Sequence, residues 1–237
     1  MDDHTKELRE NVRPIFNIFR EWLNANLVIE SNWAVLEIGV GPNGFPPFYA
    51  EMFRSYVGLD VDDYRKNYAD IINARVLMYD GLTMPLPDAS IDLIVSHSCF
   101  EHISDVSRVL DESDRVLRRG GHIYITINPL YYSSWGSHGT LPDHATRLAP
   151  WEHLNPASPI YLTDCPPQMM QAGYKGCFLN KLTVSQLLGE VGRKPWSIMK
   201  FDRAYEAIPV PDFARSSGIP MGDILNHDIR LLARKDW

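Results

Sequence analysis

The chain has 237 residues, a length that accommodates one sizeable α/β domain. Hydrophobic residues make up 45% and charged residues 22%, which excludes a mostly disordered chain. The formal net charge of -7 lacks the basic excess that general nucleic-acid binding and anionic membrane surfaces require. Neither a nucleic acid nor a membrane is therefore expected as a partner.

The N-terminus and the cysteines predict a cytoplasmic protein. The first residues are charged and indicate no secretory signal, and no apolar run approaches the roughly 20 residues that span a bilayer. Cys99, Cys165 and Cys177 are odd in number and form no CxxC pair, so they indicate neither a disulfide framework nor a zinc knuckle.

An N-terminal helical segment is expected over residues 1–30. Apolar residues from Leu8 to Leu23 recur at a spacing that gives one apolar stripe on a helix. Pro14 interrupts this stripe. Because proline suits the first turn of a helix and not its interior, a second helical piece is expected to begin there.

Residues 33–127 alternate between short apolar runs and helical patterns. The runs predict buried strands at 34–38, 56–60, 74–80, 91–96 and 122–127. Between them, Pro47 is expected to open one helix, and Ser104 to cap another that ends at Gly120 and Gly121. Strands that alternate with helices predict an α/β fold with a doubly wound, mostly parallel sheet.

The remaining chain predicts two insertions and a terminal hairpin within a single domain, residues 1–237. Residues 128–180 are rich in proline, glycine, serine, histidine and aromatics, and form a long insertion after strand 5. Residues 183–237 supply a helix that starts with the capping box of Thr183 and Gln186, and strands at 196–201 and 229–233. A second insertion lies at about 203–224. No clear crossover helix separates the last two strands, which predicts an antiparallel hairpin and a seven-stranded sheet.

A glycine turn follows the first predicted strand. Gly39, Gly41 and Gly44 satisfy GxGxxG, and Asp60 ends the second strand, where it can accept hydrogen bonds from a ribose diol. This pattern alone does not separate NAD from S-adenosylmethionine, because both ligands place an adenosine at the switch point of a parallel sheet.

Three features favour S-adenosylmethionine. Glu37 can face the ammonium of an amino acid but would be misplaced beside a pyrophosphate. Asp80, at the end of the third strand, can accept from an adenine amino group. The terminal hairpin is the third feature. In addition, the chain lacks the Tyr-x-x-x-Lys pair that short-chain dehydrogenases need.

The chain resembles the class I S-adenosylmethionine-dependent methyltransferases, in particular the type 11-like group with small-molecule substrates. The matching stretches lie in the family's order, at 35–41, 57–61, 80–81, 85–88, 90–96, 101–103 and 115–121. The resemblance implies a Rossmann-like methyltransferase fold, with S-adenosylmethionine as cofactor and S-adenosylhomocysteine as product. It places cofactor contacts at Glu37, Gly39, Gly41, Asp60, Val61, Asp80, Gly81, Ser96 and His97. Asn43 stands where many members have a third glycine, and asparagine tolerates positive φ.

Histidines supply the candidate catalytic groups. Methyl transfer needs a base only where the acceptor keeps its proton, and histidine suits that role because its pKa is near neutrality. Five histidines fall in the expected pocket region: His97, His102, His138, His144 and His153. His102 and His138 are the catalytic candidates. The spacing of the insertion's histidines and acids matches no compact ligand motif, so no metal is predicted.

Tyr131, Tyr132 and Trp135 are candidate contacts of the acceptor. Aromatics beside neutral polar groups suit a small uncharged or amphipathic molecule, and the insertion is expected to form a lid over it. These aromatics can equally pack within a lid or form an oligomer contact. The predicted activity is methyl transfer to a small molecule, at oxygen. The alternatives are an NAD(P)-dependent oxidoreductase and a non-catalytic adenosyl-ligand-binding module.

Overall fold

The computed structural model describes residues 3–42, 44–138, 148–165 and 178–237. Asn43, His144 and Cys177 therefore lie outside the described residues, and the long insertion is described in part. Within the described ranges, no helix combines the length and the apolar character needed to cross a membrane.

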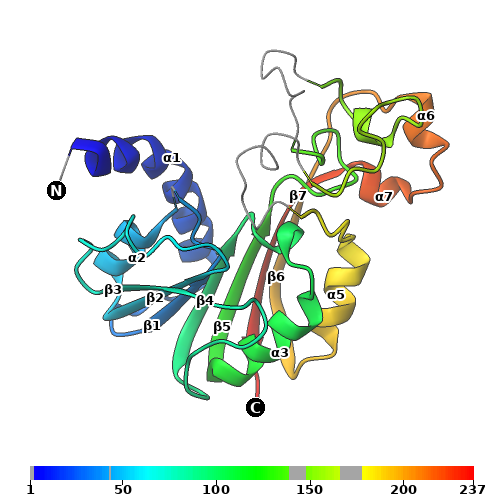
Figure 1. Ribbon diagram of the computed structural model, residues 1–237. Coiled ribbons are helices and arrows are strands. Elements are labelled where there is room, and N and C mark those ends of the chain that lie inside the picture. Colours follow the sequence, from blue (N-terminus) through cyan, green and yellow to red (C-terminus); the bar gives the residue numbers. More distant parts are fainter. Residues whose placement is uncertain (1–2, 43, 139–147, 166–177) are drawn as a thin grey trace.

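The described residues form one seven-stranded sheet (Figure 1). The strands are β1 (Ala34–Ile38), β2 (Ser55–Asp60), β3 (Ala74–Met78), β4 (Ile91–His97), β5 (Leu117–Ile127), β6 (Trp196–Tyr205) and β7 (Asn226–Lys235). Their order is β3-β2-β1-β4-β5-β7-β6, with β1 to β5 parallel and β7 antiparallel to both of its neighbours. The mostly parallel sheet and the terminal hairpin are thus confirmed. The strand order reverses between β1 and β4, where doubly wound sheets bind ligands.

Helices cover both faces of the sheet. The α-helices are α1 (Asp3–Asn26), α2 (Pro46–Met52), α3 (Val106–Val116), α5 (Val184–Gly192), α6 (Asp212–Arg215) and α7 (Met221–Ile224), and the 3-10 helices are η1 (Phe100–His102) and η2 (Glu152–Leu154). Apolar residues of α1 and α2 pack on one face, and those of α3 and α5 on the other. Val35 and Leu36 belong to these two opposite cores and are both fully buried. Burial on both faces explains the continuous apolar runs of the strands.

The N-terminal helix differs from the prediction at Pro14. α1 is one helix that contains this proline, and no second helical piece begins there. Pro14 lies on the exposed side of α1, whereas Phe16 and Leu23 are buried against the sheet. The packing of this apolar stripe offsets the backbone hydrogen bond that a proline removes.

The predicted ends of α3 are also corrected. Asp105, not Ser104, caps the helix, because its side chain accepts a hydrogen bond from Arg108 N. The helix ends at Val116, and β5 begins at Leu117 instead of at His122. Leu117 pairs with Ile91 of β4, and the pairing resumes at His122 after a register shift, so the residues that were predicted to end the helix lie in an irregular part of β5.

The two insertions pack against each other, which the sequence did not predict. Trp151 from the first is fully buried with Ala214 and Ile224 from the second. The Trp151 indole donates a hydrogen bond to the Ile224 carbonyl oxygen at 3.3 Å, and Glu206 accepts one from Ser134 N at 2.9 Å. This small third core lies beyond the carboxyl ends of the central strands (Figure 1).

An ionic cluster around the buried Glu112 ties the β3–β4 loop to α3. Glu112 accepts hydrogen bonds from Met84 N at 2.8 Å and from the Arg115 guanidinium at 3.0 and 2.8 Å. Arg115 in turn donates to the carbonyl oxygens of Met84 and Leu86 and to the carboxylate of Asp88. The loop that carries Asp80 is therefore held by charge-assisted hydrogen bonds, which are stronger than neutral ones.

Replacing Glu112 with glutamine should destabilise the fold by about 1–3 kcal/mol at pH 7, because the amide cannot maintain the charged hydrogen bonds. The hydrogen bonds from Arg115 lower the pKa of Glu112. Their contribution to stability is therefore full above the ordinary pKa of about 4.3 and is lost as the pH falls through the lower folded value. Urea unfolding of both proteins at pH 7 and pH 3 measures this, and the gap between them should narrow in acid.

Glu190→Gln is the matched control for this prediction. Glu190 also pairs with an arginine three positions later, but Arg193 is 66% exposed, and exposed pairs contribute little. An equal loss in both variants would show that the loop contact to Met84 has no particular importance.

Candidate functional site

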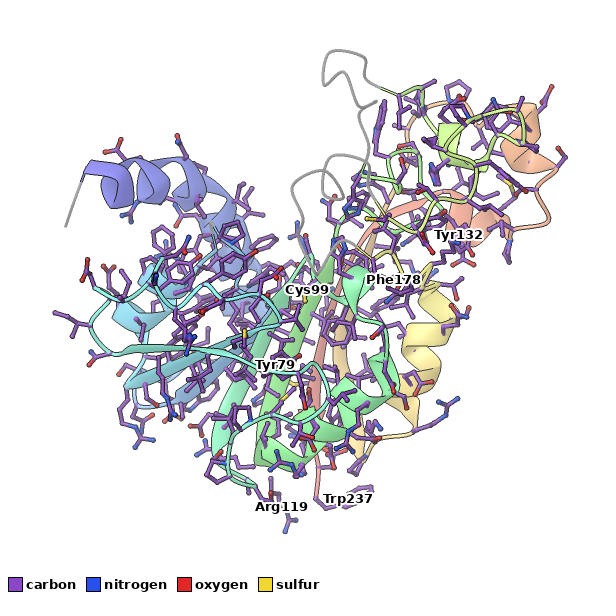
Figure 2. All side chains as sticks on the ribbon, in the orientation of Figure 1. Tyr79, Cys99, Arg119, Tyr132, Phe178 and Trp237 are labelled. Carbon is purple, nitrogen blue, oxygen red and sulfur yellow. The ribbon has the colours of Figure 1, made fainter. Side chains whose placement is uncertain are left out.

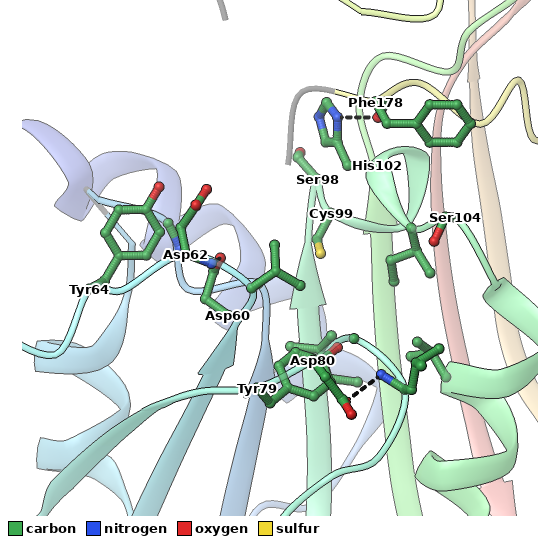
Figure 3. A pocket seen from close by; sticks show the side chains of 18 of the residues that line it. Asp60, Asp62, Tyr64, Tyr79, Asp80, Ser98, Cys99, His102, Ser104 and Phe178 are labelled. Atoms are coloured by element: carbon green, nitrogen blue, oxygen red, sulfur yellow. Dashed lines mark hydrogen bonds between the residues drawn. The ribbon is translucent and has the colours of Figure 1, made fainter. Parts of the chain in front are cut away.

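A cavity of about 480 Å³ opens at the carboxyl ends of β1, β2, β3 and β4 (Figure 3). Six of the residues predicted to bind the cofactor line it, namely Gly39, Gly41, Asp60, Val61, Asp80 and Gly81. His102, a predicted catalytic residue, lines it as well. Figure 2 shows Cys99 and Phe178 at this end of the sheet and Arg119 and Trp237 at the opposite end.

The glycine turn has a conformation that requires glycine at its start. Gly39 and Gly41 have φ of 80° and 59°, in the left-handed region. A Cβ on Gly39 would lie 2.3 Å from the Cys99 sulfur, so the segment after β4 leaves no room for a side chain. The Tyr68 hydroxyl accepts from Gly44 N at 2.7 Å and donates to the Gly41 carbonyl oxygen at 2.8 Å. These two bonds hold the turn from outside the cavity.

Asp60 connects the end of β2 to this turn. One carboxylate oxygen accepts from Gly41 N at 3.0 Å, and the other from Asp62 N at 3.0 Å. Burial raises the pKa of Asp60, and the backbone N–H groups offset this only in part. Each carboxylate oxygen has a second lone pair, so Asp60 can also accept two hydroxyl hydrogen bonds from a ligand in the cavity.

Asp80 holds the turn after β3. Its Oδ1 accepts from Leu82 N and Thr83 N, both at 2.8 Å (Figure 3 draws a bond between Asp80 and a backbone nitrogen). These hydrogen bonds lower the pKa of Asp80, so the group is a carboxylate at neutral pH. With Oδ1 fixed by the turn, Oδ2 is the atom that can accept from a ligand donor.

Glu37 lies under the glycine turn and is not among the residues that line the cavity. It is 1% exposed and accepts a hydrogen bond from the Tyr56 hydroxyl at 2.5 Å. Burial raises the pKa of Glu37 to about 8. The protonated acid is therefore the main form of this group at pH 7.

Ser96 and His97 are buried in the sheet and do not line the cavity either. The Ser96 hydroxyl donates to the Ile38 carbonyl oxygen at 2.9 Å. The His97 ring stacks on Phe19 with centroids 4.3 Å apart, and its Nε2 lies 2.7 Å from the Tyr49 hydroxyl oxygen. Burial lowers the pKa of His97 to about 3, so the ring is neutral. In this structure both side chains support the end of β4.

The structure brings the two predicted catalytic histidines together. The rings of His102 and His138 are 5.1 Å apart and nearly perpendicular. His102 Nδ1 lies 3.0 Å from the carbonyl oxygen of Phe178, a residue that also lines the cavity. Burial lowers the pKa of His102, and that of His138 to about 4. Both imidazoles are therefore neutral at pH 7.

The three predicted acceptor contacts do not line this cavity. Tyr131 is buried in the core between the two insertions and donates to the Thr163 carbonyl oxygen at 2.7 Å. Tyr132 packs against it edge to face, and Trp135 is half-buried. Of the insertion aromatics in the described part of the chain, Phe178 is the one on the cavity wall.

Several lining residues were not singled out from the sequence. They are Asp62, Tyr64, Tyr79, Leu82, Ser98, Cys99 and Phe178. Asp62 and Tyr79 directly follow strands whose carboxyl ends were already assigned to the crevice, so their positions were a usable signal. Phe178 offers no such signal, because it reaches the cavity through the fold of the insertion.

Comparison with known proteins identifies the central part of the chain. Residues 36–125 match the family described as a methyltransferase domain. A probable S-adenosylmethionine-dependent methyltransferase of Mycolicibacterium smegmatis is 32% identical over 117 residues, which cover 48% of this chain and 46% of that protein. The chain thus matches about half the length of this curated relative.

Solved structures extend the likeness of fold over nearly the whole chain. An S-adenosylmethionine-dependent methyltransferase from Mesorhizobium loti superposes with a TM-score of 0.58 and 19% identity, over 90% of this chain and 96% of that one. A geranyl diphosphate C-methyltransferase from Streptomyces coelicolor, solved with Mg²⁺, geranyl diphosphate and S-adenosyl-L-homocysteine, has a TM-score of 0.60 and 10% identity, over 99% and 85%.

The strand order, the glycine turn with its acid at the end of β2, and the matched domain lead to one assignment. Residues 36–125 match a methyltransferase domain, and the described residues have the Rossmann-like fold of S-adenosylmethionine-dependent methyltransferases.

Proposed function

We propose that this protein transfers the methyl group of S-adenosylmethionine to an oxygen atom of a small-molecule acceptor. One observation carries the proposal: the glycine turn, Asp60 and Asp80 converge on a single cavity at the switch point of the sheet. Groups that suit a methionine moiety, a ribose and an adenine thus face the same space.

The cofactor's adenosine lies between the ends of β2 and β3 in this proposal. Asp60 accepts hydrogen bonds from the two ribose hydroxyls, and Asp80 accepts one from the adenine amino group. Val61 and Tyr79 supply apolar and aromatic surface on the same wall. The methionine moiety runs along Gly39 and Gly41, where backbone can approach it closely because no side chain intervenes.

The acceptor lies on the side of His102 and Phe178. His102 lines the cavity, and the His138 ring packs against it, with the two ring centroids 5.1 Å apart. Neutral imidazoles can accept the proton that a hydroxyl loses on methylation. The methyl carbon then moves to the acceptor oxygen in an in-line displacement, in which its bond to the sulfonium sulfur breaks and S-adenosylhomocysteine leaves. Holding the oxygen and the methyl carbon at contact distance in a dry space supplies much of the rate.

The described residues of the insertion act as a cover on this side. Phe178 stands on the cavity wall, and Asn180 donates hydrogen bonds to the carbonyl oxygens of Phe100 and Ile103 at 2.6 and 2.7 Å. These bonds fix the insertion's end against η1. Tyr131, Tyr132 and Trp135 belong to the same cover, where they contribute to acceptor selection by shaping it.

Cofactor identity is tested by ligand-induced stabilisation. S-adenosylmethionine and S-adenosylhomocysteine at about 100 times their dissociation constants should stabilise the fold by ~2.7 kcal/mol, a Tm increase of roughly 5–10 °C. NAD and NADP at the same concentrations should leave the Tm unchanged. Differential scanning calorimetry measures both effects, and stabilisation by NAD alone would favour an oxidoreductase instead.

Asp60→Ala should weaken the binding of S-adenosylhomocysteine by roughly 10–150-fold, because two charge-assisted hydrogen bonds worth ~1.5–3 kcal/mol are lost. Isothermal titration calorimetry gives the affinity. Asp63→Ala is the matched control, since Asp63 pairs with Arg65 and does not line the cavity. Unchanged affinity in folded Asp60→Ala protein would remove the ribose assignment.

Glu37→Gln tests the acid beneath the turn. Because the folded pKa is raised to about 8, the contribution of Glu37 to stability is full below about 4.5 and is lost as the pH rises to about 8. The variant should therefore gain stability relative to wild type between pH 5 and pH 8. Urea unfolding across this range measures the gain. A gap that does not change with pH would mean that Glu37 has an ordinary pKa.

A further inference from the structure

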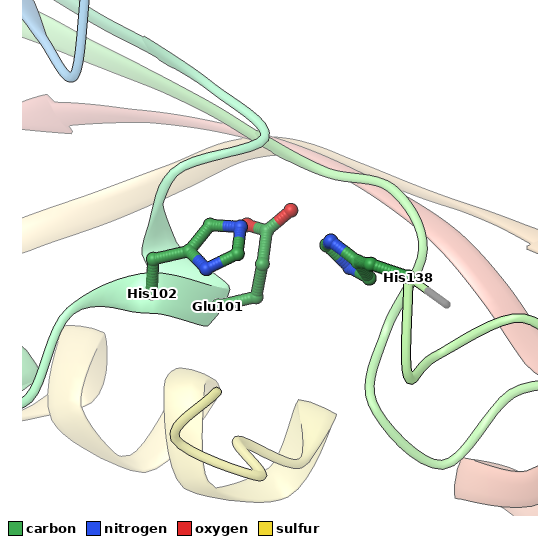
Figure 4. Close-up of side chains that lie close together, drawn as sticks. All are labelled: Glu101, His102 and His138. Carbon is green, nitrogen blue, oxygen red and sulfur yellow. The ribbon is translucent and has the colours of Figure 1, made fainter. Parts of the chain in front are cut away.

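Three potential metal ligands meet at the acceptor side of the cavity. Glu101 and His102 belong to η1, and His138 follows β5 in the long insertion (Figure 4). One carboxylate oxygen and one ring nitrogen from each histidine all lie within 4.8 Å of one another. The side chains point toward a common centre although they come from two separate segments (Figure 4).

Glu101 is a buried carboxyl group that needs a compensating partner. It is 2% exposed, and neither of its oxygens has a hydrogen bond of good geometry among the described residues. Buried carboxylates are normally paired or coordinate a metal, so the position of Glu101 favours a cation beside it.

A backbone hydrogen bond orients His102 for metal binding. His102 Nδ1 can only donate to the Phe178 carbonyl oxygen, which leaves the lone pair on Nε2. Such a backbone hydrogen bond on the far nitrogen is the usual way in which a ligating histidine is oriented. Asn180 adds support by fixing both ends of η1.

We propose that Glu101, His102 and His138 form a binding site for one divalent transition-metal ion, Zn²⁺ or Fe²⁺, at the wall of the cofactor cavity. Two imidazoles and one carboxylate are a ligand set of these ions, whereas Mg²⁺ prefers oxygen ligands. Metal–ligand distances of about 2.0–2.2 Å place the ligand atoms of a tetrahedral site about 3.3–3.6 Å apart, so the three side chains close the site by rotating toward one another.

The ion has a specific use at this position. Three protein ligands leave a coordination position open, as in catalytic zinc sites. With the ion bound, the imidazole nitrogens are its ligands and no longer act as the base. An acceptor hydroxyl coordinated to the ion instead loses its proton to solvent water, because the cation stabilises the resulting oxyanion. This role rests on the proposed methyl transfer to oxygen. Metal binding itself does not, since it depends on the three side chains alone.

Metal titration of chelator-treated protein tests the site. Wild type should bind one Zn²⁺ per chain in calorimetry, and one Co²⁺ with visible absorption that reports nitrogen ligands. Glu101→Gln, His102→Ala and His138→Ala should each weaken Zn²⁺ binding at least ~10–100-fold. Glu152→Gln and His122→Asn are the controls and should stay within about twofold, because neither side chain belongs to the cluster. Excess Mg²⁺ should not displace Co²⁺.

Thermal unfolding distinguishes a variant that has lost only its metal site from one that no longer folds. Glu101→Gln removes a buried acid and should fold at least as stably as metal-free wild type, whereas Zn²⁺ should raise the Tm of wild type only. Equal Zn²⁺ affinity in wild type and all three variants, or no binding by wild type, would overturn the site. Stabilisation by S-adenosylhomocysteine in metal-free protein is a separate readout, so failure of the metal site and failure of the cofactor assignment are distinguishable.

Discussion

The close approach of the turn after β1 to the segment after β4 is the constraint on which the site depends. At Gly39 there is no room for a Cβ, because the Cys99 sulfur would lie 2.3 Å from it. This contact brings the glycine turn and η1 to the same end of the sheet. Asp60 then links the turn to β2 through Gly41 N. The chain continues from β1 and from β4 toward opposite sides of the sheet, so space opens between the ends of these two strands. The glycine turn has no side chains to fill that space, and the cavity remains.

Three buried glutamates show that the groups next to a carboxyl group determine whether it is charged. Glu112 is buried against Arg115, which lowers its pKa and makes it a structural anion. Glu37 and Glu101 lack such a cation, and burial raises the pKa of each to about 8. The first therefore stabilises the fold by being charged, whereas the other two favour a proton or an added cation. Of these two, Glu101 lies within 4.8 Å of ring nitrogens of His102 and His138, which makes it the candidate for ligand chemistry.

The two insertions create the acceptor side by packing on each other. Trp151 and Ile224, far apart in the sequence, share one small core beyond the sheet. His138, from the first insertion, packs against the His102 ring. Phe178 and Asn180, at the end of this insertion, form hydrogen bonds with residues of η1. In the proposed function, selection of an acceptor depends on contacts between the insertions, while the cofactor end depends on the sheet.

The sequence by itself determined the sheet, its terminal hairpin and most of the cofactor wall, because periodicity and strand-end acids are local signals that a parallel sheet converts directly into positions. It did not determine that α1 continues through Pro14, since tertiary packing offset a local preference. Nor did it predict that Tyr131 would lie in the core between the two insertions, or that Glu101 would be buried beside His138. Those outcomes depend on contacts between remote segments, for which one-dimensional spacing carries no information. Only the tertiary structure decided them.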